Sequence, residues 1–403
     1  MDIFLARQPI FNRNQHVVGY ELLHRSCSKN YFMGIDGDLA TSELISNAFL
    51  DIGIDKITRG KRAYINFTRK LLEDETALFL PKNSVAIEIL EDVEPENTVL
   101  DACKKLKKLG YTLVLDDCDF TNNCEEFLDL VDIVKIDFQR VKIQNKAGIS
   151  SFFSGRDNKM LAEKVETVKD YNMAMDYGFD LMQGYFFCKP VVLSSKGMPA
   201  NKLQSMRLLQ EIYKQEMDFD KIEKLIKEDA SLSYKLLRCI NSLAYATRFK
   251  ISSIRQAMAL LGQKEMIKWA SLACLHSLSS DKPDELLITA IARARFCETM
   301  ALEAKLEGKS SEYFIIGLFS LLDTFLDRPM EEILDELPLM EEIKEALLLF
   351  PNEYRVPLDI FLLYERGYFD EAFELAVKEY EIDDVTVMRS YLSAIEMADV
   401  KWT

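Results

Sequence analysis

Carboxylate, amide and lysine side chains recur at the ends of short apolar runs in the first half of this 403-residue chain. They are Glu21, Asn66, Glu88, Asp116, Asp117, Lys135, Glu163 and Gln183. Oxygen ligands without histidine or cysteine suit hard cations such as Mg²⁺ or Mn²⁺, and clustered carboxylates need cations to be tolerated. Two metals that share Asp116 and Asp117 suit in-line attack of water on a phosphodiester. The pattern predicts such a site if the fold brings these residues together.

The apolar runs alternate with amphipathic helical stretches from residue 5 to residue 190, which predicts a parallel α/β domain. Residues 12–15 between the first two runs suit a hairpin, so we expect a TIM-like α/β barrel with an antiparallel first strand pair. In such a barrel the carboxyl ends of the strands share one face, which holds the active site. The expected strands are 5–11, 16–24, 62–67, 84–90, 112–117, 132–137, 159–163 and 181–187.

The sequence changes character after Pro190, where residues 194–199 form a short link into almost uninterrupted helical periodicity. We therefore expect two domains, a barrel over residues 1–195 and an all-α domain over residues 200–403.

Composition limits the partners and the compartment. The formal net charge of −16 argues against nucleic acid as a partner. The eight cysteines are scattered without a Cys-x-x-Cys pair, which is typical of reduced thiols. We see neither a signal-peptide pattern at the N-terminus nor an apolar run of about 20 residues, so we expect a cytoplasmic protein with no membrane contact.

Several short motifs resemble those of the EAL family of cyclic di-GMP phosphodiesterases. The segment Gly19-Tyr20-Glu21-Leu22-Leu23 looks like the Glu-Ala-Leu signature, with Leu22 in place of alanine. The other motifs are Arg7-Gln8-Pro9-Ile10-Phe11, Tyr64-Ile65-Asn66, Ile87-Glu88-Ile89-Leu90-Glu91, Val114-Leu115-Asp116-Asp117, Val134-Lys135-Ile136-Asp137, Ala162-Glu163 and Gln183-Gly184-Tyr185. The resemblance covers roughly residues 5–190.

The resemblance implies a role for each matching residue. Glu21, Asn66, Glu88 and Asp116 hold one Mg²⁺ or Mn²⁺, and Asp116, Asp117 and Glu163 a second. The same likeness implies that Lys135 and Glu163 orient or deprotonate the attacking water, that Gln183 supports the site, and that Gln8 and Arg25 contact the guanine or phosphate of cyclic di-GMP.

The surroundings of these motifs depart from the family. Residues 118–124 replace the family's glycine-containing loop after the Asp-Asp pair, residues 26–62 contain no proline, and Lys164 stands where the family has glycine. A metal site can lose activity when the groups around its ligands change, so retention of the metals is left open. The changed loop also leaves open whether the chain forms a homodimer, as the family's members do through that loop.

The second half resembles the HDOD family, whose helical fold is similar to that of HD-type phosphohydrolases. The likeness rests on residues 226–242, on residues 254–262 with Trp269, and on residues 317–322. This half contains one histidine, His276, whereas HD hydrolases need several to hold their metals. The resemblance therefore implies a regulatory or output domain that binds protein partners.

These observations favour a bacterial signal transduction protein related to cyclic di-GMP signalling. We expect the barrel to be a sensor or scaffold and the helical domain to transmit to partners, which the changed loop favours. The alternative is an active metal-dependent phosphodiesterase that linearises cyclic di-GMP, which the nearly complete set of carboxylates favours. In a third interpretation the chain holds neither metal nor nucleotide and uses both domains for protein contacts.

Overall fold

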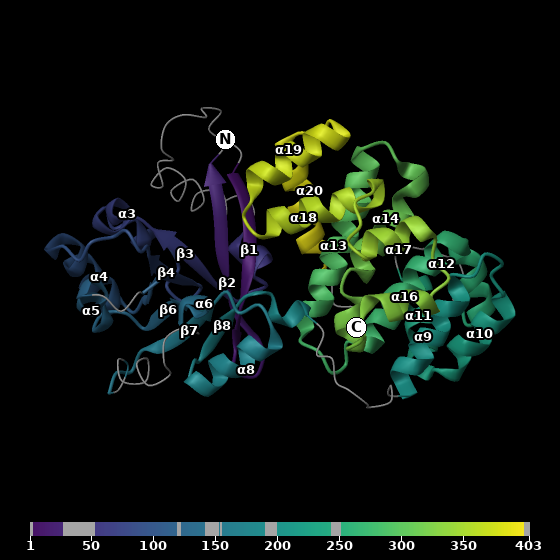
Figure 1. The fold of residues 1–403 in the computed structure, drawn as a ribbon, viewed down its shortest axis with the longest axis horizontal. Coiled ribbons are helices and arrows are strands. Elements are labelled where there is room, and N and C mark those ends of the chain that lie inside the picture. The colour runs from purple at the N-terminus through teal and green to yellow at the C-terminus, as the bar shows by residue number, and fades with distance from the viewer. Residues whose placement is uncertain are drawn as a thin grey trace. The chain divides into compact units, whose positions relative to one another are not determined.

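The computed structural model describes residues 3–26, 53–118, 122–141, 153, 155–189, 200–242 and 251–398. They form two compact units. The first is a closed eight-stranded barrel with strand order β1 to β8 (Figure 1). Its strands are β1 (Ile3–Asn12), β2 (Val17–Ser26), β3 (Arg62–Phe67), β4 (Val85–Ile89), β5 (Thr112–Leu115), β6 (Ile133–Asp137), β7 (Lys159–Glu163) and β8 (Leu181–Gln183). The predicted α/β barrel is confirmed.

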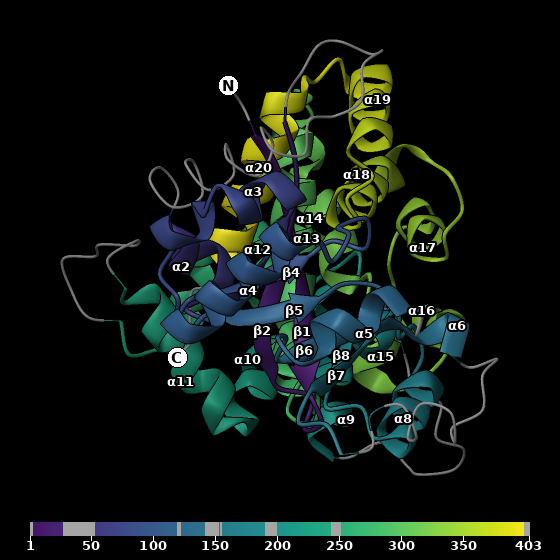
Figure 2. The ribbon, with the colours of Figure 1, turned by 90° about the vertical axis from the view of Figure 1, so that its left-hand side faces the viewer.

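Strand β1 pairs antiparallel with both β2 and β8, and every other neighbouring pair is parallel. The predicted antiparallel pair therefore opens the barrel. Helices surround the strands (Figure 2). They are α2 (Ile54–Thr58), α3 (Arg69–Glu73), α4 (Asn97–Leu109), α5 (Asn122–Leu128), α6 (Phe138–Val141) and α8 (Val168–Tyr177), with short 3-10 turns at Thr76–Phe79 and Tyr185–Cys188.

Strand β8 ends at Gln183, four residues before the expected end at residue 187. Gly184 follows with φ 143°, and a Cβ there would lie 2.2 Å from the carbonyl oxygen of Val165. The chain can make this close turn only without a side chain, and it continues as a 3-10 turn rather than as a strand.

One layer of side chains fills the barrel below its mouth. It is made by Ile10, Tyr64, Ala86, Val114, Ile133, Leu161 and Leu181, one from each strand except β2. In β2 the corresponding position is Gly19, where a Cβ would lie 2.5 Å from the ring of Tyr64. The tyrosine ring therefore takes the space that a β2 side chain would need.

The second unit is helical, as predicted. Its helices are α9 (Ala200–Ile212), α10 (Phe219–Glu228), α11 (Ala230–Ile240), α12 (Ile254–Leu278), α13 (Asp284–Glu303), α14 (Ser310–Phe319), α15 (Leu322–Leu326), α16 (Met330–Glu336), α17 (Glu341–Leu347), α18 (Val356–Glu365), α19 (Phe369–Tyr380) and α20 (Asp384–Ala398). Segments Leu362–Glu374 and Asp384–Leu392 of the last three helices group with the barrel unit. There, the ring of Phe373 lies 4.5 Å from that of Phe4.

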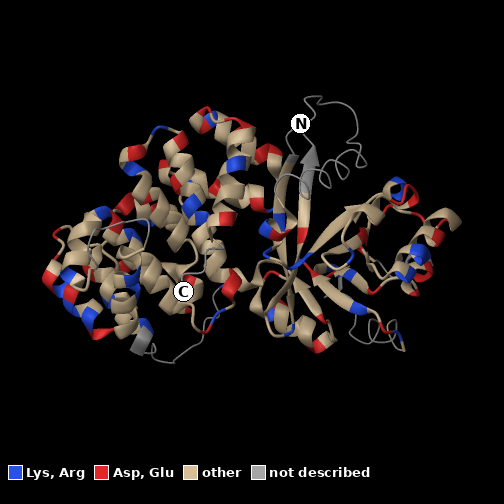
Figure 3. Cartoon of the chain, turned by 180° about the vertical axis from the view of Figure 1, so that it is seen from behind, with Lys and Arg blue, Asp and Glu red and all other residues tan. Residues whose placement is uncertain are grey.

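Two glycines shape the helical unit. Gly262 has φ 70° and ψ 173°, which divides α12 into two helical pieces. Gly317 lets α14 approach α13, since a Cβ there would lie 2.4 Å from the backbone of Arg293. Both signs of charge are interspersed over the described residues of each unit (Figure 3). No helix within the described ranges is long and apolar enough to cross a membrane.

Candidate active site

The polar residues of the barrel mouth stand two positions along each strand from the filling layer. The pairs are Ile10 and Gln8, Gly19 and Glu21, Tyr64 and Asn66, Ala86 and Glu88, Val114 and Asp116, Ile133 and Lys135, Leu161 and Glu163, and Leu181 and Gln183. Side chains two residues apart share a face of a strand. Because each layer residue faces the barrel interior, the polar residue two positions from it also faces the interior, at the mouth. The polar residue of β1 precedes its layer residue, since β1 runs the opposite way to β8.

Lys135 lies at the centre of this group. Its side chain is 1% exposed, and its Nζ lies 2.9 Å from Glu163 Oε1 and 3.0 Å from Asp116 Oδ1. The same Nζ lies 3.3 Å from Glu88 Oε1 and 3.4 Å from Glu21 Oε2. One ammonium thus faces four carboxylates, which leaves an excess of negative charge in a buried space.

A chain of amides supports Glu21. The Nε2 of Gln183 donates to Glu21 Oε2 at 2.6 Å and to Gln8 Oε1 at 3.0 Å. Gln8 and Glu21 are also direct register partners across β1 and β2. Gln183 therefore fixes the orientation of the Glu21 carboxylate.

Burial and like charge shift the pKa values of these groups. Burial raises the pKa of Glu88 well above its usual value, against the attraction of Lys135. Burial also raises the pKa of Glu163 to about 7, again against Lys135, with Asp116 and Glu21 adding repulsion. For Lys135, burial lowers the pKa, but the four carboxylates outweigh burial and raise it well above its usual value. Groups shifted in this way are typical of functional sites.

The donor set fits a hard cation, although its oxygens converge on Lys135 as they stand. Glu88 has no exposed surface, and its Oε1 lies 3.3 Å from the Lys135 ammonium, but its Oε2 is buried with neither a hydrogen bond nor an ion pair to a described group. Such buried acceptors are costly unless a cation or donor meets them. Among the described residues, no three carboxylate, thiol or imidazole groups stand in the arrangement of a formed metal site. An ion held at this mouth would compete with Lys135 for the carboxylate oxygens.

Asp117 stands in a second, outer network rather than around Lys135. It has φ 38°, and its Oδ2 accepts from Nη1 of Arg140 at 3.0 Å. The Nε of Arg140 lies 3.7 Å from Asp137 Oδ2, which also accepts from Lys164 Nζ at 2.8 Å. A hydrogen bond to Asp117 raises the pKa of Glu91. The outer network links Glu91, Asp117, Arg140, Asp137 and Lys164.

The sequence pointed to part of this network only. Lys164 has φ 54°, a left-handed conformation that explains why the family has glycine there. Its departure from the motif was visible in the sequence, but its ion pair with Asp137 was not. Arg140 was not identified at all, and its one sequence signal is its place three residues after Asp137 on α6.

Some predicted features fall outside the described part of the chain. The backbone of Arg25 lies in β2 opposite Phe4, but its side chain is not described. Residues 27–52 of the proline-free segment, residues 119–121 of the changed loop and the link at 194–199 are also outside it.

Two polar side chains of the helical unit, Asn241 and His276, have local partners. Asn241 Nδ2 donates to the carbonyl oxygens of Leu237 and Ile251, and Asn241 Oδ1 accepts from the Ile251 amide. His276 Nδ1 lies 3.2 Å from Lys235 Nζ, and burial followed by this lysine lowers the pKa of the imidazole. The ammonium of Lys235 so close to His276 makes metal binding by this histidine unfavourable.

The two units correspond to known domain families. The EAL domain model matches residues 45–190, and the HDOD domain model matches residues 198–327. A barrel with its polar groups at the carboxyl ends of its strands, followed by a helical domain, is thus an EAL–HDOD arrangement.

Two curated relatives match nearly the whole chain. The chain is 38% identical over 404 residues to the uncharacterised protein YuxH of Bacillus subtilis, covering 98% of both. It is 37% identical over 376 residues to the cyclic di-GMP phosphodiesterase CdgJ of Vibrio cholerae, covering 93% of this chain and 85% of CdgJ. The chain therefore belongs to the family of proteins that join an EAL domain to an HDOD domain.

Among solved structures, the EAL enzyme Bd1971 in its cAMP- and cyclic-di-GMP-bound form is similar, with 20% identity and a TM-score of 0.35. The match covers 47% of this chain and 62% of the Bd1971 chain.

Proposed function

We propose that the barrel hydrolyses cyclic di-GMP to the linear dinucleotide with the help of divalent metal. The observation that carries this proposal is the convergence of Glu21, Glu88, Asp116 and Glu163 on the Nζ of Lys135. The 37% identity to a cyclic di-GMP phosphodiesterase over 93% of the chain supports it. In this proposal, the differences from the family pattern lie in the groups around the site, and the residues of the site itself are kept.

The metals in this proposal are Mg²⁺ or Mn²⁺. Glu21, Asn66, Glu88 and Asp116 would hold one ion, and Asp116 with Asp117 and Glu163 would hold the other. The buried Oε2 of Glu88, which accepts no hydrogen bond from a described group, supports the first assignment. When bound, the ions polarise the phosphate and acidify the attacking water.

The chain's own residues then handle the proton and the substrate. Glu163 accepts a proton from the water, for which a pKa of about 7 suits a base at neutral pH. The water oxygen bonds to phosphorus, the bond from phosphorus to the ribose 3′ oxygen breaks, and that oxygen takes up a proton. Lys135 steadies the charge of Glu163 and the phosphate, Gln183 holds Glu21, and Gln8 and Arg25 contact the guanine or phosphate.

The test uses the purified full-length chain with cyclic di-GMP and Mn²⁺ or Mg²⁺, and follows the linear product by chromatography. We expect product from the wild type and a loss of at least about a hundredfold with Glu21→Gln, since a metal ligand is removed. Glu125→Gln, an exposed change on α5, is the matched control. Absence of product with either metal contradicts the proposal.

A sensor or scaffold is the second candidate. The ion pair between Arg140 and Asp117 favours this function, because it occupies a carboxylate that is proposed as a ligand of the second metal. Calorimetry separates the two functions. A sensor binds cyclic di-GMP without turnover, whereas an enzyme binds it and releases the linear product.

For the helical unit we propose a regulatory or output role through protein partners, either another protein or a second copy of the chain. Exposed apolar side chains support this, among them Leu349 and Phe350, which are 69% and 59% exposed. Light scattering of the purified chain, with and without Leu349→Ser/Phe350→Ser, tests self-association: a dimer that these changes dissociate supports it, and a monomer throughout leaves a different protein as the partner.

A further inference from the structure

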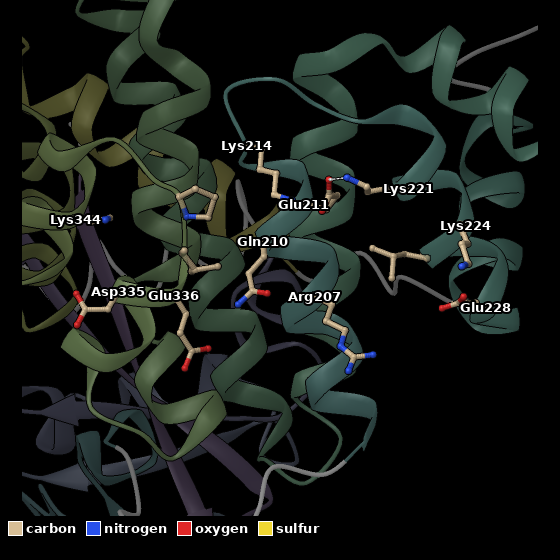
Figure 4. A pocket seen from close by; sticks show the side chains of 13 residues that line it. Arg207, Gln210, Glu211, Lys214, Lys221, Lys224, Glu228, Asp335, Glu336 and Lys344 are labelled. Carbon is tan, nitrogen blue, oxygen red and sulfur yellow. Dashed lines mark hydrogen bonds and ion pairs between the residues drawn. The ribbon is translucent and has the colours of Figure 1, made fainter.

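A pocket of about 750 Å³ lies in the helical unit, and none of the residues assigned to cyclic di-GMP lines it (Figure 4). Its walls are the faces of α9 and α10 and the segment from the end of α16 to α17. The volume falls within the range of small-ligand pockets, about 300–1,000 Å³. A ligand of nucleotide size fits it.

The floor of this pocket contains a buried acceptor that no described residue satisfies. Glu211 is 9% exposed, and its Oε2 accepts from Lys214 Nζ at 2.6 Å. Its Oε1 is buried and accepts no hydrogen bond from a described group, and Lys221 Nζ lies 3.9 Å from it. A buried carboxylate oxygen in this state favours a ligand that brings an N–H or O–H donor.

The rim of the pocket offers positive charge. Arg207 on α9 and Lys224 on α10 both line it and are exposed, and neither forms an ion pair with any residue that the structure describes. Lys221 is held instead by Asp218 at 3.1 Å. In a chain with a net charge of −16, two open cations beside one pocket favour an anionic group, and the fork of arginine matches phosphate.

Three apolar residues also line the pocket. Leu225 of α10 lines the pocket, as do Leu337 and Pro338 after α16. These side chains offer a surface on which a planar ring can rest. The pocket therefore combines an acceptor, cations and an apolar wall, whereas inorganic phosphate uses the cations alone.

We propose that this pocket binds a nucleotide. Its phosphate contacts Arg207 and Lys224, its base lies against Leu225, Leu337 and Pro338, and an N–H of the base donates to Glu211 Oε1. The site is independent of the barrel chemistry and gives the helical unit a small-molecule ligand of its own.

The test titrates the full-length chain by calorimetry with GMP, AMP, ribose 5-phosphate and inorganic phosphate, in EDTA so that no metal contributes. We expect the nucleotides to bind more tightly than ribose 5-phosphate, and inorganic phosphate most weakly. Arg207→Ala/Lys224→Ala weakens all ligands by about tenfold or more, because charge-assisted bonds are lost. Glu211→Gln weakens the nucleotides by about fivefold and leaves ribose 5-phosphate unchanged, because a neutral amide accepts a weaker hydrogen bond.

Lys108→Ala/Lys169→Ala, two exposed lysines of the barrel unit, is the matched control and leaves every affinity unchanged. Melting temperatures check that each variant is folded. The proposal is wrong if the wild type binds no nucleotide. It is equally wrong if nucleotides bind but neither pocket variant weakens them, since that result places the binding elsewhere.

Discussion

Buried charge is arranged differently in the two units. In the barrel, five charged side chains from different strands meet at one point, with the Lys135 ammonium within 3.4 Å of four carboxylates. In the helical unit, a buried lysine has its own local partners: Lys202 is 4% exposed and donates to the Phe325 carbonyl oxygen and to Asp281.

The difference distinguishes a charge arrangement suited to a chemical site from one that stabilises the fold. A buried lysine with a carbonyl and one carboxylate is balanced, so it can serve to join helices. A lysine facing four carboxylates is not balanced, and such an excess of negative charge is costly unless a further cation enters. The imbalance around Lys135 is why we propose the metal site at the barrel mouth, whereas Lys202 needs no further cation.

The largest expected effect comes from removing the central cation. Lys135→Met leaves four carboxylates without their shared partner, and we expect the free energy of unfolding to fall by about 3–5 kcal/mol. Lys202→Met removes one local set of hydrogen bonds and should cost about 1–3 kcal/mol. Urea unfolding in EDTA measures both, and equal losses would contradict the comparison.

A change at Glu88 tests whether the imbalance serves a metal. Glu88→Gln replaces a carboxyl group whose charged form is disfavoured by burial with a neutral amide, so the metal-free protein should gain on the order of 1 kcal/mol of stability. The same change removes a proposed ligand, and Mn²⁺ should then raise the melting temperature less than in the wild type. Glu125→Gln serves as the control and keeps the full Mn²⁺ effect. If Mn²⁺ stabilises Glu88→Gln as much as the wild type, Glu88 is not a ligand.

The pH dependence of stability tests Glu163. Its folded-state pKa of about 7 lies above the ordinary value of 4.5, so folding favours the protonated form. This contribution is fully present below pH 4.5 and is lost as the pH rises through about 7. In EDTA, the stability of the wild type relative to Glu163→Gln should therefore fall between these values. A constant difference across this range would show that the pKa of Glu163 is not raised.

The alternation of polar and apolar residues made most of the site predictable from sequence. Asn66, Glu88 and Lys135 each stand two residues beyond an apolar residue of the same strand, and period two places such pairs on one face. Closure of the barrel then brings the strand ends together. The eight strands and the helical second half follow from the same periodicities.

The remainder depends on backbone turns that carry no periodic signal. The last strand was expected to run to residue 187, but the close approach of Gly184 to Val165 ends it at Gln183. Asp117 was predicted to share a metal with Asp116, and nothing in the sequence indicated that its φ would be 38° or that its Oδ2 would accept a hydrogen bond from Arg140. Sequence spacing places a residue at a strand end and leaves the direction of the next side chain undetermined.

Arg140 gives the smallest effect and tests whether the outer network restrains the second metal. Its guanidinium bonds Asp117 Oδ2 at 3.0 Å, so a cation that uses Asp117 must displace it. The Arg140 side chain is 61% exposed, which limits the strength of the ion pair. We expect Arg140→Gln to tighten the weaker of two Mn²⁺ sites by about fivefold, equivalent to roughly 1 kcal/mol, and to leave the tighter site unchanged. Calorimetric Mn²⁺ titration measures this, with Arg69→Gln, which breaks exposed ion pairs to Glu73 and Glu96, as the control. Identical titrations of wild type and Arg140→Gln would show that Asp117 is available to the metal despite Arg140, and that the outer network holds the loop rather than the ion.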